Sequence, residues 1–221
     1  MKRLSDYITL NESEVGNLRP TNKEELIDII NQRIKEQGPR CDLNDIDVSR
    51  VRDMSNLFER SKFNGDISKW DVSRVVDMKY MFWNSQFNGD ISQWSVSRVK
   101  DMDSMFWNSK FDGDISLWDV SSVRNMRYMF WSSKFNRDLS KWDVSRVKDM
   151  YGMFYNSLFD GDISDWNVSS VTNMGHMFED SHFSGDLSKW DVSRVKDMSY
   201  IFTGSPLEGS EPEWYRYGRL V

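Results

Sequence analysis

The chain has 221 residues, with 29 basic and 35 acidic side chains and a formal net charge of −6. This length is enough for about one to one and a half domains with a sizeable core. An aromatic content of 14% excludes disorder over most of the chain, because disordered chains are poor in these residues. One cysteine and two histidines exclude an internal disulfide and a cysteine-rich zinc site, so we expect no metal and no cofactor. We see no signal-like or membrane-spanning apolar run, and we expect a cytoplasmic protein without membrane contact.

The first 45 residues precede the repeated part of the sequence. Residues 1–20 are polar and unpatterned, and we expect them to form an arm outside the core. Residues 21–45 begin with a capping box, Thr21 to Glu24, and continue with apolar residues at helical spacing as far as Ile34. Gly38 and Pro39 then end the pattern. This segment is predicted to be a helix, followed by a short junction, that caps the N-terminal end of the repeats.

Residues 46–205 repeat with a period of 24. We number the positions of the unit as columns one to twenty-four. Column one holds Ile46 and then a recurring tryptophan: Trp70, Trp94, Trp118, Trp142, Trp166 and Trp190. A fixed period in this range is typical of stacked repeats, in which a unit buries its apolar face only against its neighbours. The predicted core is the set of constant apolar columns, which in the second unit are Val72, Val75, Met78, Phe82 and Ile91.

Two elements are predicted in each unit. Apolar residues spaced by three and then by two, as in Ile67, Trp70 and Val72, match the strand of a leucine-rich repeat. Residues 77–84 start with an aspartate that suits an N-cap and carry apolar residues at i, i+3 and i+4, which predicts a short helix. The predicted fold class is an α/β repeat solenoid. It is leucine-rich-repeat-like, with one short parallel strand and one short helix per unit and an N-terminal capping helix.

Residues 206–221 are predicted to close the C-terminal end of the seven repeats. Pro206 and Pro212 remove hydrogen-bond donors on the approach to Trp214. The sequence from Trp214 to Tyr217 is predicted to be an edge strand that resists further pairing.

The string W-D-V-S-x-V-x-D-M-x-x-M-F, followed by F-N-G-D-I-S, resembles the BspA-type leucine-rich repeats of bacterial surface proteins and mycoplasma-type lipoproteins. The resemblance covers residues 46–205. It implies a solenoid with a parallel sheet on one face, which binds proteins or host surfaces and has no enzymatic activity in its repeats. The chain shows no signal peptide, lipobox or anchor, which argues against an adhesin. Its opening residues also look like those of small proteins encoded by gut bacteria and their phages.

The columns that vary between units are the candidates for function. On a helical projection, column fourteen lies opposite the apolar columns and is predicted to be exposed. It carries large aromatic residues in the four central units, and columns ten and eleven add others. The candidate partner-binding residues are Trp83, Trp107, Trp131, Tyr155, Tyr80, Tyr128 and Tyr151. Two interpretations stay open, a surface that binds another protein or rings that only stack on one another, and a carbohydrate platform is a further alternative.

Charged residues also follow columns. Basic residues dominate columns five and seven, as in Arg74 and Lys100, whereas aspartates dominate columns two and twenty-one, as in Asp71 and Asp90. Because both signs alternate and the total charge is negative, we expect ion pairing between units rather than nucleic-acid binding. The column twenty-one aspartates are expected to accept turn hydrogen bonds rather than to bind calcium.

No set of residues suggests catalysis. Phosphate-binding loops, metalloprotease motifs and dinucleotide fingerprints are absent from the sequence. His176 and His182 are expected to be surface residues rather than metal ligands, because zinc sites need three or four ligands. We therefore expect a monomeric, non-enzymatic protein-binding repeat module whose partner the sequence does not identify. The alternatives are a structural component of a phage particle or surface assembly and a glycan-binding module.

Overall fold

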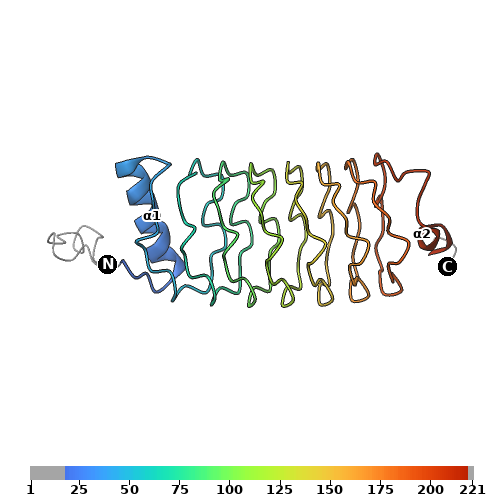
Figure 1. Ribbon diagram of the computed structural model, residues 1–221, viewed down its shortest axis with the longest axis horizontal. Helices are drawn as coiled ribbons and strands as arrows, with labels where there is room; N and C mark the ends of the chain where they lie inside the picture. The colour runs from blue at the N-terminus through green and yellow to red at the C-terminus, as the bar shows by residue number, and fades with distance from the viewer. Residues whose placement is uncertain (1–17, 219–221) are drawn as a thin grey trace.

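The computed structural model describes residues 18–218, so most of the predicted N-terminal arm lies outside the described residues. The chain winds into successive coils that stack along one axis, with helix α1 (Lys23–Gln37) at one end and helix α2 (Glu213–Gly218) at the other (Figure 1). Backbone hydrogen bonds join neighbouring coils: Met78 N donates to Asp101 O at 3.0 Å, and Tyr80 N donates to Asp103 O at 2.9 Å. Residues of one column therefore lie in a line along the stack.

The α/β class predicted from the sequence is wrong. Over residues 18–218 the helices are α1 and α2, and the coils contain no β-strand. Parallel pairing is confined to isolated bridges, most of them in column eight, such as that between Asp77 and Asp101. The coils therefore lack both the strand and the helix that a leucine-rich repeat requires.

Tight turns replace the predicted strand. Trp70 N donates to Ile67 O at 3.2 Å, and Val75 N donates to Val72 O at 2.9 Å. Both are i to i+3 hydrogen bonds of β-turns. The apolar spacing of three thus marks the two ends of a turn, both with side chains directed into the core. The same spacing occurs in the strand of a leucine-rich repeat, which is why the sequence pattern was misleading.

Left-handed residues prevent the predicted helix. Column eleven has a positive φ in every unit, as at Tyr80 (φ 57°), and so does column fifteen, as at Asn84 (φ 51°). An α-helix needs φ near −63° at every residue, so these positions interrupt it. In the first six units their N–H groups donate to the next coil instead of to a carbonyl four residues back. Asp77 accepts a hydrogen bond from Lys79 N at 3.0 Å, which is a local aspartate turn rather than a helix cap.

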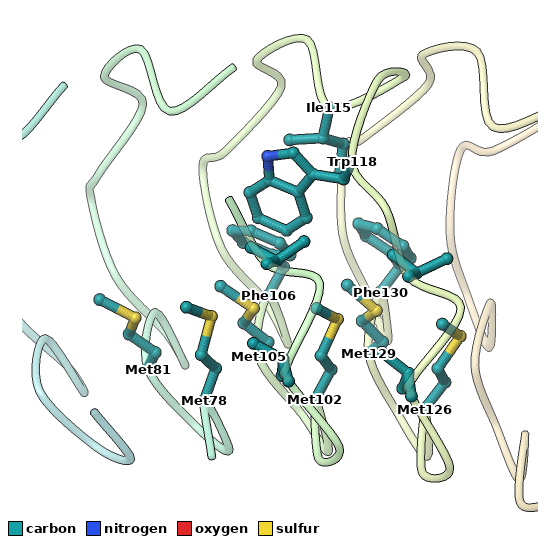
Figure 2. Packing of buried hydrophobic residues seen from close by; sticks show 14 of the residues in the cluster. Met78, Met81, Met102, Met105, Phe106, Ile115, Trp118, Met126, Met129 and Phe130 are labelled. Carbon is teal, nitrogen blue, oxygen red and sulfur yellow. The ribbon is translucent and has the colours of Figure 1, made fainter. Parts of the chain in front are cut away.

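The core consists of parallel side-chain ladders. The apolar columns predicted as core are buried throughout the first six units, and Figure 2 shows methionines of successive coils side by side beneath the phenylalanines. Phe106 stacks on Phe82 and on Phe130, with 5.7 Å between ring centroids in both pairs. Each indole of column one, from Trp70 to Trp214, donates Nε1 to a carbonyl 27 residues earlier at 2.8–3.1 Å. These bonds satisfy one buried donor and one buried acceptor in each coil.

Helix α1 covers the N-terminal coil and lies where the capping helix was predicted. Its N-cap is Asn22, one residue later than predicted, and the Asn22 side chain accepts a hydrogen bond from Glu25 N at 2.9 Å. Leu26 and Ile30 are the buried residues of the helix. Leu18, which the sequence assigned to the arm, instead forms a parallel bridge with Ile46.

Helix α2 closes the other end, so the edge strand predicted from Trp214 is wrong. Pro212 directly precedes the helix. Proline has no N–H group, and at the start of a helix an N–H group would have no partner within the helix, so no hydrogen bond is lost. Trp214 Nε1 donates to Leu187 O at 2.8 Å, and the Tyr215 ring meets Phe202 edge-on with 5.2 Å between centroids. The helical turn brings both rings over the last coil and covers it.

Candidate functional site

All seven predicted partner-binding residues lie close together along one edge of the stack, and all are half-buried. Together with two further rings in column eleven they form what we call the aromatic edge: Tyr80, Trp83, Trp107, Tyr128, Trp131, Tyr151, Tyr155, His176 and Tyr200. The helical projection predicts that column fourteen is exposed, whereas its four aromatic rings are half-buried. No helix is present there, and Trp83, Trp107 and Trp131 each lie against the ring of the next coil.

The column-fourteen rings cover one another's faces. Trp131 stacks on Trp107 at 4.8 Å with an interplanar angle of 18°, and on Tyr155 at 3.8 Å with an angle of 15°. Trp83 meets Trp107 edge-on at 6.4 Å. Both faces of the Trp131 indole are therefore occupied by this chain, and what it offers to a partner is its edge.

A second row of rings runs beside the first. Tyr128 meets Trp107 and Trp131 edge-on, with centroids 5.0 and 5.1 Å away. Tyr151 continues the row from Tyr128 at 5.2 Å, and His176 follows at 5.0 Å. The rings of the aromatic edge other than Tyr80 are thus joined by a continuous series of ring contacts, which His176 and Tyr200 complete at 5.0 Å.

The backbone of column eleven does not call for aromatic side chains. Tyr80, Tyr128 and His176 have φ values of 57°, 53° and 59°. Non-glycine residues seldom adopt this left-handed region, which suits asparagine and glycine best. Other units do place Asn56 and Gly152 in the same column. The tyrosines are therefore additions that the turn itself tolerates but does not need.

Charged groups differ between the two ends of the aromatic edge. Near its N-terminal end the Arg60 guanidinium lies over the Trp83 ring, 4.4 Å from the centroid. Near its C-terminal end, burial raises the pKa of Tyr155, and the negative charges of Glu179 and Asp180 add to the effect. Glu179 also contacts His176 Nδ1. Arg60 and Asp180 are not among the site residues predicted from the sequence, although both stand in column fifteen, directly beside the aromatic column.

Column ten places two opposite charges at the middle of the edge. The Arg127 guanidinium lies 5.2 Å from the Tyr128 ring centroid, and its Nε is 3.8 Å from Asp149 Oδ2. Burial raises the pKa of the Asp103 carboxyl. The Ser104 hydroxyl donates a hydrogen bond to this carboxyl at 2.6 Å, which lowers the pKa and so offsets part of the effect of burial.

The basic columns do not pair as predicted. Over residues 18–218, no ion pair involves the basic residues of columns five and seven. The prediction that these columns form ion pairs between units is therefore wrong. The aspartates of columns two and twenty-one instead accept backbone hydrogen bonds two residues on, as Asp90 does from Ser92 N at 2.9 Å. The turn role predicted for column twenty-one is confirmed.

The remaining polar features offer little chemistry. A shallow, open hollow near the C-terminal end is lined by Ser181, His182 and Asp160, among others. The Ser181 hydroxyl accepts from Phe183 N at 3.3 Å, and Asp160 accepts from Ser184 N at 2.8 Å, so both are committed to the backbone. Within the described range, no cluster of three or more histidine, cysteine or acidic side chains is arranged to hold a metal ion. Neither described helix has the length and apolar character needed to cross a membrane.

Comparison with known proteins places the chain in a family. The model of a family described as Mycoplasma protein of unknown function, DUF285, matches residues 30–134 and 132–206. Together these matches cover all of residues 46–205. The chain belongs to this family. Membership in DUF285 makes the chain a repeat protein and does not by itself show that its repeats are of the BspA type. No curated protein and no solved structure matches it.

Proposed function

We propose that the chain is a non-enzymatic protein-binding repeat module and that the aromatic edge is its contact surface. The observation that supports this most strongly is the contiguous row of half-exposed rings in the central coils, at columns where the fold accepts small or polar residues in other units. Tryptophan and tyrosine are the residues most often found as anchors of protein interfaces.

Mutual stacking suits these rings for binding. Trp107, Trp131 and Tyr155 hold one another in place at 3.8–4.8 Å, so little side-chain freedom is left to lose when a partner docks. The resemblance to BspA-type repeats points the same way, because proteins or host surfaces are the ligands of that family.

The glycan alternative fits this geometry less well. Sugars stack on the faces of aromatic rings, and both faces of Trp131 are covered by neighbouring rings of the same chain. The exposed ring edges carry the positive part of the ring quadrupole and suit carbonyl and carboxylate groups of a protein. A structural role in a larger assembly uses the same surface and differs only in the identity of the partner.

The test is affinity capture with the double variant Trp107→Ala/Trp131→Ala. We expect the variant to keep its fold, because both side chains are half-buried at the edge, and to lose proteins that the wild type captures. Leu117→Ala is the matched control, because Leu117 is 73% exposed and lies in column twenty-four. Binding is then measured between purified proteins. Unchanged capture by a folded double variant would refute the proposal.

A further inference from the structure

The residues of the aromatic edge are arranged so that the edge complements a second copy of itself. In a face-to-face dimer whose two-fold axis crosses the stack at right angles, the coils of the two copies run in opposite directions. Each column then faces the same column of the partner. An axis between the third and fourth units pairs the first unit with the sixth, the second with the fifth and the third with the fourth.

Three facing pairs in this register are complementary, whereas in column fourteen Glu59 faces Glu179. In column fifteen, Arg60 of one copy faces Asp180 of the other, and both residues are exposed. In column ten, Asp103 faces Arg127, and Lys79 faces the ring of Tyr151. Each of these contacts occurs twice in a symmetric dimer, so the complementarity is doubled.

Side-chain sizes match as well. In column eleven, Tyr80 faces the coil of Gly152, and Tyr128 faces the coil of Ser104; both small residues are buried, so no large column-eleven side chain projects there towards the facing ring. In column fourteen, Trp107 faces Trp131 at the centre of the contact.

Neighbouring registers lose this match. With the axis moved to the third unit, Lys79 faces Arg127 and Tyr80 faces Tyr128. With the axis moved to the fourth unit, Arg60 faces Gly204 and Trp83 faces Glu179. The complementarity therefore selects one register of the stack.

We propose that the aromatic edge pairs with the aromatic edge of a second copy, antiparallel, with the two-fold axis between Trp107 and Trp131. This rests on the proposed function, since it names the partner of the same surface. The contact from the first to the sixth unit is about 24 Å long, from five steps of about 4.8 Å. So short an edge buries less than a standard interface, and we expect a dissociation constant on the order of tens to hundreds of micromolar. The monomer expected from the sequence is the dilute form.

Charge exchange at column fifteen tests the pairing. Arg60 and Asp180 have nearly the same left-handed backbone, with φ values of 53° and 54°. The variants Arg60→Asp and Asp180→Arg therefore put aspartate and arginine into a conformation that each already adopts in this column. In sedimentation velocity over a concentration series, each single variant is expected to dimerise at least about tenfold more weakly than the wild type. An equimolar mixture of the two single variants is expected to form a heterodimer close to wild-type strength. In that heterodimer, as in the wild-type dimer, an arginine faces an aspartate at both column-fifteen contacts, whereas the single variants pair like charges.

Two controls separate this pairing from other effects. Lys189→Asp makes the same change of charge in column twenty-four, at an exposed ion pair away from the aromatic edge, and should leave dimerisation unchanged. Circular dichroism checks that the single variants keep their fold. Wild-type protein that stays monomeric at about 1 mM would overturn the inference, as would single variants that dimerise normally or a mixture that dimerises no better than its components. A monomer that still captures another protein through Trp107 and Trp131 would leave the proposed function standing.

Discussion

Replacing a phenylalanine in the middle of the core ladder should cost more than replacing the same residue at its end. Phe106 is fully buried and stacks on a ring of the same column on both sides, each at 5.7 Å. Phe202 is 2% exposed but has a same-column neighbour on one side, Phe178 at 6.1 Å. Trp214 and Tyr215 cover its other side at an angle.

The magnitude follows from burial and stacking. Truncation of a buried phenylalanine to alanine costs about 3–5 kcal/mol through lost transfer free energy and the cavity left behind. A stacked aromatic pair adds about 0.5–1.5 kcal/mol beyond the buried area. Phe106→Ala is therefore expected near 5 kcal/mol. Phe202→Ala is expected about 1 kcal/mol lower, because Phe202 lacks a second same-column ring and a counterpart of Phe111, which stacks on Phe106 at 4.4 Å, while its angled contacts with Trp214 and Tyr215 offset part of this difference.

Urea unfolding followed by tryptophan fluorescence and by far-UV circular dichroism measures both costs. Phe106→Leu is the matched control, since it keeps most of the apolar volume and removes only the ring. In the Phe106→Ala variant, the unfolding transitions followed by fluorescence and by circular dichroism should also occur at different urea concentrations, because the coils on the two sides of the substitution no longer unfold together. Equal costs at the two positions, with coincident transitions, would show that stacking between coils adds nothing beyond burial.

Two further predictions concern the polar ladders. Ser109 is 3% exposed, and its hydroxyl accepts from Phe111 N at 3.1 Å, so Ser109→Ala should lower the free energy of unfolding in urea by about 1–3 kcal/mol through an unpaired buried N–H. The exposed Ser95→Ala is its control, and a loss there as large as at Ser109 would contradict this reasoning. Hydrogen bonds from the serine two residues on lower the pKa of Asp114 and Asp138. The stability that these carboxylates contribute is complete above the unfolded pKa of about 3.9 and is lost as the pH falls through the lower folded values. Thermal midpoints should therefore hold between about pH 7 and 5 and drop below about pH 4, with a shallower drop for Asp114→Asn/Asp138→Asn. Asparagine keeps the turn acceptor, as Asn167 does for Ser169 N at 3.2 Å, and an identical acid profile in the double variant would refute the assignment.

The repeat period, the buried columns and the close approach of the candidate rings followed from the sequence alone. They depend only on which residues recur every 24 positions, and recurrence is visible without a structure. Trp83, Trp107, Trp131 and Tyr155 form a continuous row because the coils stack in register. The aspartate turns of column twenty-one were also predictable, since an aspartate reaches its own backbone two residues on in many contexts.

The local conformation of the coil was decided by tertiary structure. Met78, Met81 and Phe82 have the spacing of a helix, and Ile67, Trp70 and Val72 have the spacing of a repeat strand, but both segments are built from turns. In an isolated unit the N–H of Tyr80 has no partner outside its own segment, and a helix would satisfy it. In the stack it donates to Asp103 of the next coil, so a left-handed backbone at Tyr80 becomes the stable one. Periodicity specifies which side chains face inward. The hydrogen bonds between coils determine the backbone path that carries them there.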